Sequence, residues 1–461
     1  MILDQRESTA AFRAVNAANI AGLPVWARLP AELREVIQVV SRVLPFRTNE
    51  YVIRELIDWN RLPHDPMFQL TFPQRAMLAP EDYAEIRDLL HGGASHDEVN
   101  RAANRIRMSM NPHPSGQLQY NVPRLDGVML PGLQHKYRET VLFFPSQGQT
   151  CHAYCTYCFR WAQFVNLPDL RFESSETGSL VAYLKVHPEV SDVLITGGDP
   201  MIMSARLLRR YVEPLLAPEL RHVQSIRIGT KAPAYWPQRF VTDPDADDVL
   251  RLFEEIGRAG RQLALMAHYS HPVELASEIA RQCVRRIRST GAEIRVQAPV
   301  VRHVNDDPAA WIELCNGSVG LGMVPYYFFV ERDTGPKGYF EIPLIEAHAI
   351  YAKAFRRLSG LARTLRGPIM SATQGKVRIL GSTTSPGREL LLLDYLQARD
   401  PDWVGRPFFA EMTPRATWFD QLRPAFEADQ PFFEPVPAFS ASLDRATGPL
   451  PDPKQRSVAQ D

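Results

Sequence analysis

The sequence has little cysteine and no excess of either charge. Five of its 461 residues are cysteine, and Lys plus Arg equals Asp plus Glu at 52 each. So few cysteines exclude a disulfide-stapled scaffold. The balanced charge argues against binding to nucleic acid or to an acidic membrane surface, and favours a small-molecule partner.

Long apolar runs are also missing. No stretch of about 18 consecutive apolar residues occurs, as a membrane-spanning helix would require. The first 26 residues, MILDQRESTAAFRAVNAANIAGLPVW, are polar and lack the apolar segment of a signal peptide. We therefore expect a soluble, cytoplasmic protein that does not bind membranes.

The distribution of apolar and polar residues along the chain predicts three regions. Residues 1–130 carry helical patterns broken by proline-rich joints, and residues 386–461 are expected to form a C-terminal arm and a disordered tail. Between them, over 131–385, short apolar runs alternate with amphipathic stretches. The expected strands are 140–144, 192–198, 225–230, 262–268, 293–300 and 324–330.

Six β-then-α units imply an α/β fold with a parallel sheet and right-handed crossovers, either doubly wound or a full or partial barrel. The polar motifs of the chain each fall just after an apolar run. Barrel enzymes have their active sites at the carboxyl ends of the strands, so the pattern favours a barrel.

Three of the five cysteines, Cys151, Cys155 and Cys158, fall within the segment CHAYCTYCFR. Three thiolates on one loop can hold three irons of a [4Fe–4S] cluster and leave the fourth iron open to a substrate or cofactor. A zinc site completed by a distant group such as His152, and chance clustering, are the alternatives. Cys283 and Cys315 stand alone, and we interpret them as core residues.

The CxxxCxxC loop, with aromatic Tyr157 before its last cysteine, resembles the cluster loop of the radical S-adenosylmethionine superfamily. The segment LITGGDP resembles the superfamily's GGD strand end. That resemblance implies that Gly197 and Gly198 leave backbone open to the methionine moiety, and that Asp199 accepts a hydrogen bond from its amino group.

Five further segments resemble the lysine 2,3-aminomutase family, in family order: RVLPFRTNEYVIRELIDWN, RIGTKAPAYWPQRF, MAHYSHPVEL, VQAPVVRHVNDDP and VPYYFFV. The resemblance implies a partial (β/α)6 barrel with an N-terminal helical region and a C-terminal extension. It also implies a 5′-deoxyadenosyl radical, and a pyridoxal phosphate imine that carries the migrating amino group. A flavodoxin- or ferredoxin-like electron donor and association into homo-oligomers are expected with it.

The same resemblance implies roles for single residues. Cys151, Cys155 and Cys158 would ligate the cluster, and Arg160 would hold the substrate carboxylate. His268 and Gln297 would line the S-adenosylmethionine pocket. Lys376, in SATQGKVRIL, falls where the family has the lysine of the internal aldimine.

The chain departs from the family where the family grips the distant ammonium of lysine. One family aspartate is missing from GPIMSATQGK, and another aligns with Arg332 or its neighbours. Arg332 would repel an ammonium, which argues against lysine as substrate unless Glu331 or Asp333 takes over. If Arg332 faces the pocket, it suggests a carboxylate or another polar group at the far end of the substrate.

A second departure precedes the cysteine loop. Lys136 and Thr140 stand where the family places two arginines toward the cofactor phosphate. Lys136 or Arg138 could neutralise a phosphate there, without bidentate geometry at one position or both. No cysteine follows Cys315, so we expect no C-terminal zinc cluster.

These observations predict a radical S-adenosylmethionine aminomutase that moves an amino group from Cα to Cβ of an amino acid other than plain lysine. The first alternative is a radical enzyme that uses no pyridoxal phosphate and acts on a different class of substrate. The second is a noncatalytic iron–sulfur or zinc-binding protein.

Overall fold

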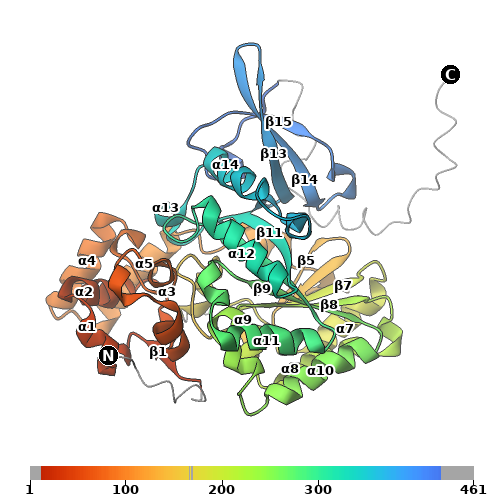
Figure 1. The fold of residues 1–461 in the computed structure, drawn as a ribbon, viewed down its shortest axis with the longest axis horizontal. Coiled ribbons are helices and arrows are strands. Elements are labelled where there is room, and N and C mark those ends of the chain that lie inside the picture. The colour runs from red at the N-terminus through yellow and green to blue at the C-terminus, as the bar shows by residue number, and fades with distance from the viewer. Residues whose placement is uncertain (1–11, 166, 168–169, 427–461) are drawn as a thin grey trace.

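The structure is a computed structural model that describes residues 12–165, 167 and 170–426. Its first part is mainly helical and lies beside the main sheet (Figure 1). Two short strands, β1 (Ala14–Asn16) and β2 (Arg47–Asn49), pair antiparallel within it. Its helices are α1 (Pro24–Arg28), α2 (Ala31–Val40), α3 (Pro66–Thr71), α4 (Pro80–His91) and α5 (His96–Ser109).

Local sequence sets the starts of two of these helices. The Asp65 carboxylate accepts hydrogen bonds from the backbone N–H groups of Met67 and Phe68 at the start of α3. At the start of α5, Ser95 and Glu98 form a reciprocal capping box. Each such cap stabilises a helix by about 1 kcal/mol. The cap on α3 matters for the site, because α3 holds the cysteine loop.

Eleven strands form the main sheet, in the order of the chain from β5 to β15. All neighbours from β6 to β12 pair parallel, and the outer pairs are antiparallel. The strands are β5 (Leu133–Tyr137), β6 (Thr140–Phe143), β7 (Asp192–Ile195), β8 (Ser225–Thr230), β9 (Gln262–His268), β10 (Glu293–Val300), β11 (Val324–Val330), β12 (Arg366–Ser371), β13 (Gly375–Ser385), β14 (Arg388–Ala398) and β15 (Phe408–Glu411).

Helices occupy the connections between the parallel strands and cover the sheet (Figure 1). A doubly wound sheet reverses its strand order at a switch point, whereas this sheet keeps chain order throughout. The sequential order therefore excludes the doubly wound alternative. The main connecting helices are α7 (Thr177–Val186), α8 (Ala205–Val212), α10 (Ala246–Arg258), α11 (Glu278–Ser289), α12 (Pro308–Gly320) and α14 (Leu344–Phe355).

The six strands predicted from apolar runs are all present, as β6 to β11, within a few residues of the expected bounds. Cys283 in α11 and Cys315 in α12 are buried in the core, as predicted. Shorter elements complete the described chain. They are α6 (Gln117–Tyr120), β3 (Arg124–Leu125), β4 (Val128–Met129), α9 (Ala232–Tyr235) and α13 (Lys337–Phe340).

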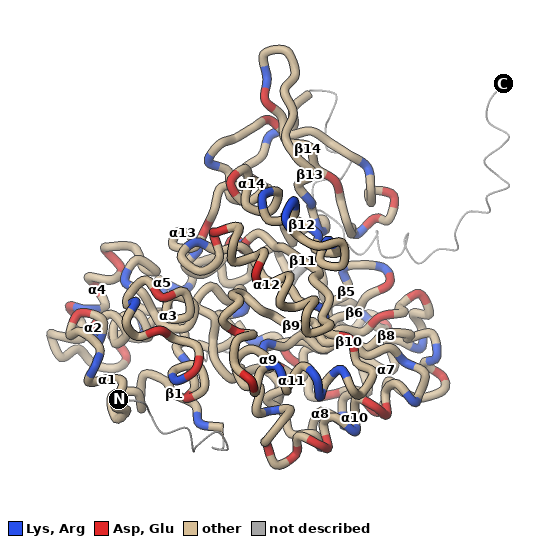
Figure 2. Tube along the Cα trace, in the orientation of Figure 1, with Lys and Arg blue, Asp and Glu red and all other residues tan. Residues whose placement is uncertain are grey.

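The end of the described chain differs from the expected arm. The boundary drawn after residue 385 falls at the turn of the β13–β14 hairpin, and β14 and β15 extend the main sheet. The expected disordered tail lies outside the described residues from 427 onward. Acidic and basic residues are interspersed along the helices that cover the sheet (Figure 2). No helix in the described part is long and apolar enough to cross a bilayer.

Candidate functional site

A cavity of about 310 Å³ lies at the carboxyl ends of the parallel strands. Its volume is in the range of small-molecule sites. Fifteen residues singled out in the sequence line it, from segments more than 200 positions apart. They are Lys136, Thr140, Cys151, Cys155, Tyr157, Cys158, Arg160, Gly197, Gly198, Asp199, His268, Gln297, Glu331, Arg332 and Lys376. Arg138 does not line it, and its guanidinium lies 3.6 Å from the Glu139 carboxylate.

The cysteine loop follows β6 and is held by the N-terminal helical region. The backbone N–H of Thr156 donates to the carbonyl of Leu70 in α3 at 2.9 Å, and that of Tyr154 donates to the carbonyl of Arg47 at 2.8 Å. Thr156 Oγ1 also donates to the carbonyl of Gln69. The helical region therefore sets the position of the thiols from outside the sheet.

The three thiols form no disulfide and lie close enough to affect one another. Burial raises the pKa of Cys151 well above its usual value, and the charges of Asp199, Cys158 and Cys155 raise it further. Burial likewise raises the pKa of Cys158 to about 12. Iron bound to these sulfurs would supply the positive charge that stabilises the thiolates, so the three side chains fit a cluster.

His152, the group named for the zinc alternative, lies in the cysteine loop. Among the described residues no three His, Cys, Asp or Glu side chains, the three cysteines included, are arranged to hold a single metal ion. His152 is buried, and its ring packs edge-on against Phe12 with centroids 5.3 Å apart. Burial lowers the pKa of His152 to about 3.

The two glycines of the GGD segment pack against the start of the cysteine loop. A Cβ on Gly198 would lie 2.5 Å from the carbonyl oxygen of Thr150, and one on Gly197 would lie 2.2 Å from Nε2 of Gln149. Gly197 also has a φ of +150°, which favours glycine. The backbone N–H of Asp199 donates to the Thr150 carbonyl at 2.7 Å. The glycines thus allow β7 to position the thiols.

The Asp199 carboxylate ties the end of β7 to that of β8. It accepts hydrogen bonds from Thr230 Oγ1 at 2.7 Å, from Lys231 N at 2.8 Å and from Met201 N at 2.9 Å. Burial raises the pKa of Asp199 to about 6. These three bonds leave about one of its four lone-pair positions for a ligand.

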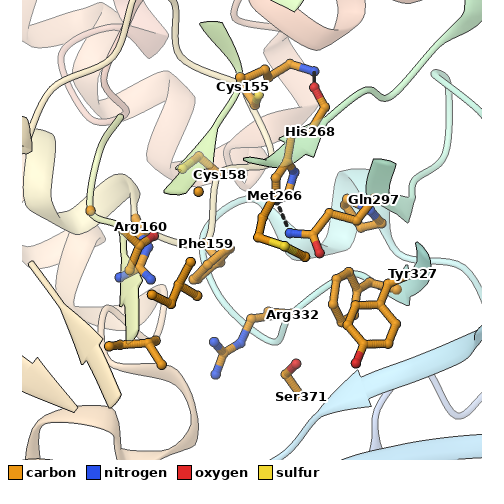
Figure 3. Close-up of a pocket in the computed structure, with 18 of the residues that line it drawn as sticks. Cys155, Cys158, Phe159, Arg160, Met266, His268, Gln297, Tyr327, Arg332 and Ser371 are labelled. Atoms are coloured by element: carbon orange, nitrogen blue, oxygen red, sulfur yellow. Dashed lines mark hydrogen bonds between the residues drawn. The ribbon is translucent and has the colours of Figure 1, made fainter. Parts of the chain in front are cut away.

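His268, the last residue of β9, faces Gln297, its register partner in β10 (Figure 3). Gln297 Nε2 lies 3.1 Å from His268 Nε2. Burial lowers the pKa of His268 to about 3, so the ring is neutral and can accept this hydrogen bond. The pair presents a neutral polar wall to the cavity beside the thiols.

Lys376 enters the cavity from β13. Its Nζ lies 2.5 Å from Oε1 of Gln397, and 4.7 Å and 5.3 Å from the ring centroids of Tyr327 and Tyr137. Burial lowers the pKa of Lys376 to about 7, and the charges of Arg227 and Arg366 act in the same direction. An amine with this pKa is about half unprotonated at neutral pH, far more than an ordinary lysine, and is suited to imine formation.

Lys136, the candidate phosphate partner, is a buried cation near other cations. Its Nζ donates to the carbonyl of Ala372, and burial together with Arg399, Arg332 and Lys376 lowers its pKa well below the usual range. A bound phosphate would relieve this repulsion. The residues at this end of the cavity therefore fit an anionic cofactor that Lys376 can reach.

The comparison with known proteins assigns the chain to a family. A protein of Aquifex aeolicus, provisionally named L-lysine 2,3-aminomutase, is 32% identical over 393 residues, which are 85% of this chain and 91% of that protein. The chain belongs to the lysine 2,3-aminomutase-like family of the radical S-adenosylmethionine superfamily. L-lysine 2,3-aminomutase of Acetoanaerobium sticklandii is 28% identical over 235 residues, and the chain covers 53% of its length.

Two further comparisons add no detail about this family member. No family model matches the chain. A radical SAM methyltransferase from Sphaerobacter thermophilus is a neighbour among solved structures, with 16% identity, a TM-score of 0.35 and coverage of 51% of this chain and 68% of that one. A TM-score this low supports no conclusion about this chain.

The departures from the family pattern also lie at the cavity. Thr140, at a family arginine position, donates to Asp192 Oδ2 at 2.8 Å. Glu331 lines the cavity, but its carboxyl oxygens are buried without a hydrogen-bond partner. Burial and Glu341 raise the pKa of Glu331 well above its usual value. Asp333 is not among the lining residues.

Sequence reasoning missed several residues that approach Lys376. Tyr137 and Tyr327 flank its amine, and Gln397 accepts its hydrogen bond from β14. Arg399 lies near Lys136 and donates to Asn121 Oδ1 at 2.5 Å. No local motif marks Gln397 or Arg399, since both come from the segment expected to be an arm.

Proposed function

We propose that this protein is a radical S-adenosylmethionine enzyme that moves an amino group from Cα to Cβ of an amino acid. One observation carries the proposal. Three thiols from one loop, the GGD strand end, the His268–Gln297 pair and a low-pKa lysine all line one cavity. In this proposal the open, sequential sheet is the partial (β/α)6 barrel that surrounds the reaction.

The thiols of Cys151, Cys155 and Cys158 would bind three irons of a [4Fe–4S] cluster. Gly197, Gly198, Asp199, His268 and Gln297 would hold S-adenosylmethionine beside it. When bound, the cluster and S-adenosylmethionine supply a carbon-centred radical that abstracts hydrogen, while pyridoxal phosphate carries the migrating amino group.

The chain's own groups would orient the reactants. Lys376 would attach the pyridoxal phosphate, with Gln397 and the rings of Tyr137 and Tyr327 fixing its amine. Lys136 would lie at the phosphate. Arg160 would hold the substrate's α-carboxylate. Its guanidinium packs on the rings of Phe144 and Phe159, and donates no hydrogen bond to any described residue.

The test is borohydride reduction of the anaerobically reconstituted protein with pyridoxal phosphate, followed by peptide mass spectrometry. We expect a phosphopyridoxyl mass on Lys376 that is absent from the Lys376→Ala variant. Lys353, in α14 and outside the cavity lining, supplies the control variant Lys353→Ala, which should keep the label. Cleavage of S-adenosylmethionine without a label on Lys376 would favour the radical enzyme that uses no pyridoxal phosphate.

A further inference from the structure

Arg160 and Arg332 are two guanidinium groups in the same cavity that pack against one ring, that of Phe159. The guanidinium carbons lie 4.9 Å and 5.1 Å from the Phe159 ring centroid. They are therefore within about 10 Å of each other by these two distances. Figure 3 shows both side chains beside Phe159, with Arg332 toward Ser371.

The donors of Arg332 are largely unused. Its Nη2 lies 2.9 Å from Ser115 Oγ and 3.5 Å from the carbonyl oxygen of Pro114. Its Nε is buried without a partner. No described carboxylate lies within ion-pair distance of it, although the charge of Asp333 acts on it from further away. An unpaired guanidinium in a cavity is the arrangement that binds a carboxylate.

Basic residues outnumber acidic residues around the cavity. Six lysines and arginines among the described residues line it, against two acids, Asp199 and Glu331. Lys231 pairs with Glu274 at 2.6 Å, and Arg227 pairs with Asp192. The other four are Lys136, Lys376, Arg160 and Arg332. In the proposed function the first two serve pyridoxal phosphate and Arg160 serves the α-carboxylate, so Arg332 remains for a second anion.

Neither lining acid is available to hold an ammonium near Arg332. The Asp199 carboxylate accepts three hydrogen bonds, from Thr230 and Lys231 at the end of β8 and from Met201 two residues after Asp199. Glu331 precedes Arg332 directly, and its carboxyl is affected by Glu341 and Lys337 rather than by the cavity arginines.

Resting on the proposed function, the geometry points to an α-amino dicarboxylic acid as the substrate, with its α-carboxylate on Arg160 and its distal carboxylate on Arg332. Four- and five-carbon members have their carboxyl groups roughly 4 to 5 Å apart. In a bidentate pair the carboxylate carbon lies about 4 Å from the guanidinium carbon, so a substrate of this length placed in line would need about 12 to 13 Å. Within about 10 Å, the two carboxylates reach the guanidinium groups at an angle to the line that joins them.

Reaction chemistry selects the five-carbon member. The step is an isomerisation in which the Cα–N bond breaks, a Cβ–N bond forms and one hydrogen moves from Cβ to Cα. Aspartate would give aspartate again, because its Cβ carries the second carboxylate. Glutamate would give 3-aminopentanedioate, a different compound of the same formula, with no net oxidant or reductant consumed.

The test is equilibrium dialysis of the reconstituted, pyridoxal-phosphate-loaded protein with radiolabelled L-glutamate, with L-glutamine and L-lysine as competitors. We expect glutamate to bind at least tenfold more tightly than either competitor. Arg332→Met should lose at least tenfold in glutamate affinity, and Arg332→Lys should recover part of it. Arg251→Met, which removes an exposed guanidinium in α10, should bind as the parent does.

Three other outcomes distinguish a failure of the substrate proposal from a failure of the proposed function. Lysine or glutamine binding as tightly as glutamate would overturn the substrate class while leaving the label on Lys376 in place. Loss of pyridoxal phosphate from Arg332→Met would assign Arg332 to the cofactor and overturn its substrate role. Absence of the label on Lys376 would instead remove the proposed function on which this inference rests.

Discussion

Lys376 and Gln397 are register partners on the antiparallel strands β13 and β14, and Nζ of the lysine lies 2.5 Å from Oε1 of the glutamine. The pairing holds the amine at the cavity without placing a negative charge beside it. Because the acceptor is neutral, it does not offset the effect of burial, which lowers the pKa of Lys376. In the proposed function, Gln397 is therefore a positioning residue that keeps Lys376 reactive.

Gln397→Glu should suppress attachment of pyridoxal phosphate at neutral pH. A carboxylate beside Nζ favours the charged amine and raises its pKa, so less of the amine is free to attack. Trapping by borohydride should recover as the pH is raised. Gln397→Leu, which adds no charge, is the comparison variant. Equal trapping by the Glu and Leu variants at every pH would contradict the electrostatic role.

Attachment in the parent protein should itself depend on pH. The pKa of Lys376 is lowered to about 7, so the unprotonated fraction falls about tenfold for each pH unit below that value. The measurement is the extent of labelling at short reaction times from about pH 5 to about pH 9, roughly two units on either side of that pKa. An ordinary lysine would still gain reactivity steeply above pH 9.

Each single change of Cys151, Cys155 or Cys158 to Ala should remove most of the bound iron. Losing a direct ligand should cost more than the roughly 10–100-fold in metal affinity that loss of an outer partner costs. The controls are Cys283→Ala and Cys315→Ala, in the core of α11 and α12. They should keep their iron and lose about 1 kcal/mol of stability. Iron content and thermal unfolding are the measurements.

Gly198→Ala should weaken iron binding without touching a ligand. Its new methyl group would meet the backbone of Thr150, which cannot give way as a flexible side chain can. We expect a loss of about 1–3 kcal/mol in the free energy of unfolding and reduced iron content. Gly178→Ala, in α7 with open space around it, should instead stabilise by about 0.5–1 kcal/mol. Full iron content in Gly198→Ala would contradict the positioning role.

The sequence predicted the repeating part of the molecule well. Apolar runs such as 225–230 and 262–268 are strands because buried parallel strands need continuous apolar stretches, and this requirement is local. The CxxxCxxC loop and the GGD segment were likewise recognisable, since each is set by a few neighbouring residues. The roles of Lys376, Arg160 and the other cavity residues stay predictions until they are tested.

The end of the chain was less predictable from local sequence. The pattern after residue 385 suggested an arm, whereas β14 joins the sheet by pairing with β13. The glycine-rich close approach of β7 to the cysteine loop also depends on which backbone lies opposite. Pairing partners and packing distances involve segments far apart in the chain, so residue type alone does not reveal them.

The sequence by itself determined the strands and the thiol loop, because short-range patterns encode them, and its resemblance to the family pointed to the candidate lysine. Only the tertiary structure decided that the sheet runs in chain order, that Gln397 faces Lys376, and that Arg160 and Arg332 share the ring of Phe159. Arg332 follows Arg160 by 172 positions, and no local pattern relates them. Their proximity arises because parallel strands bring their carboxyl ends to one edge of the sheet.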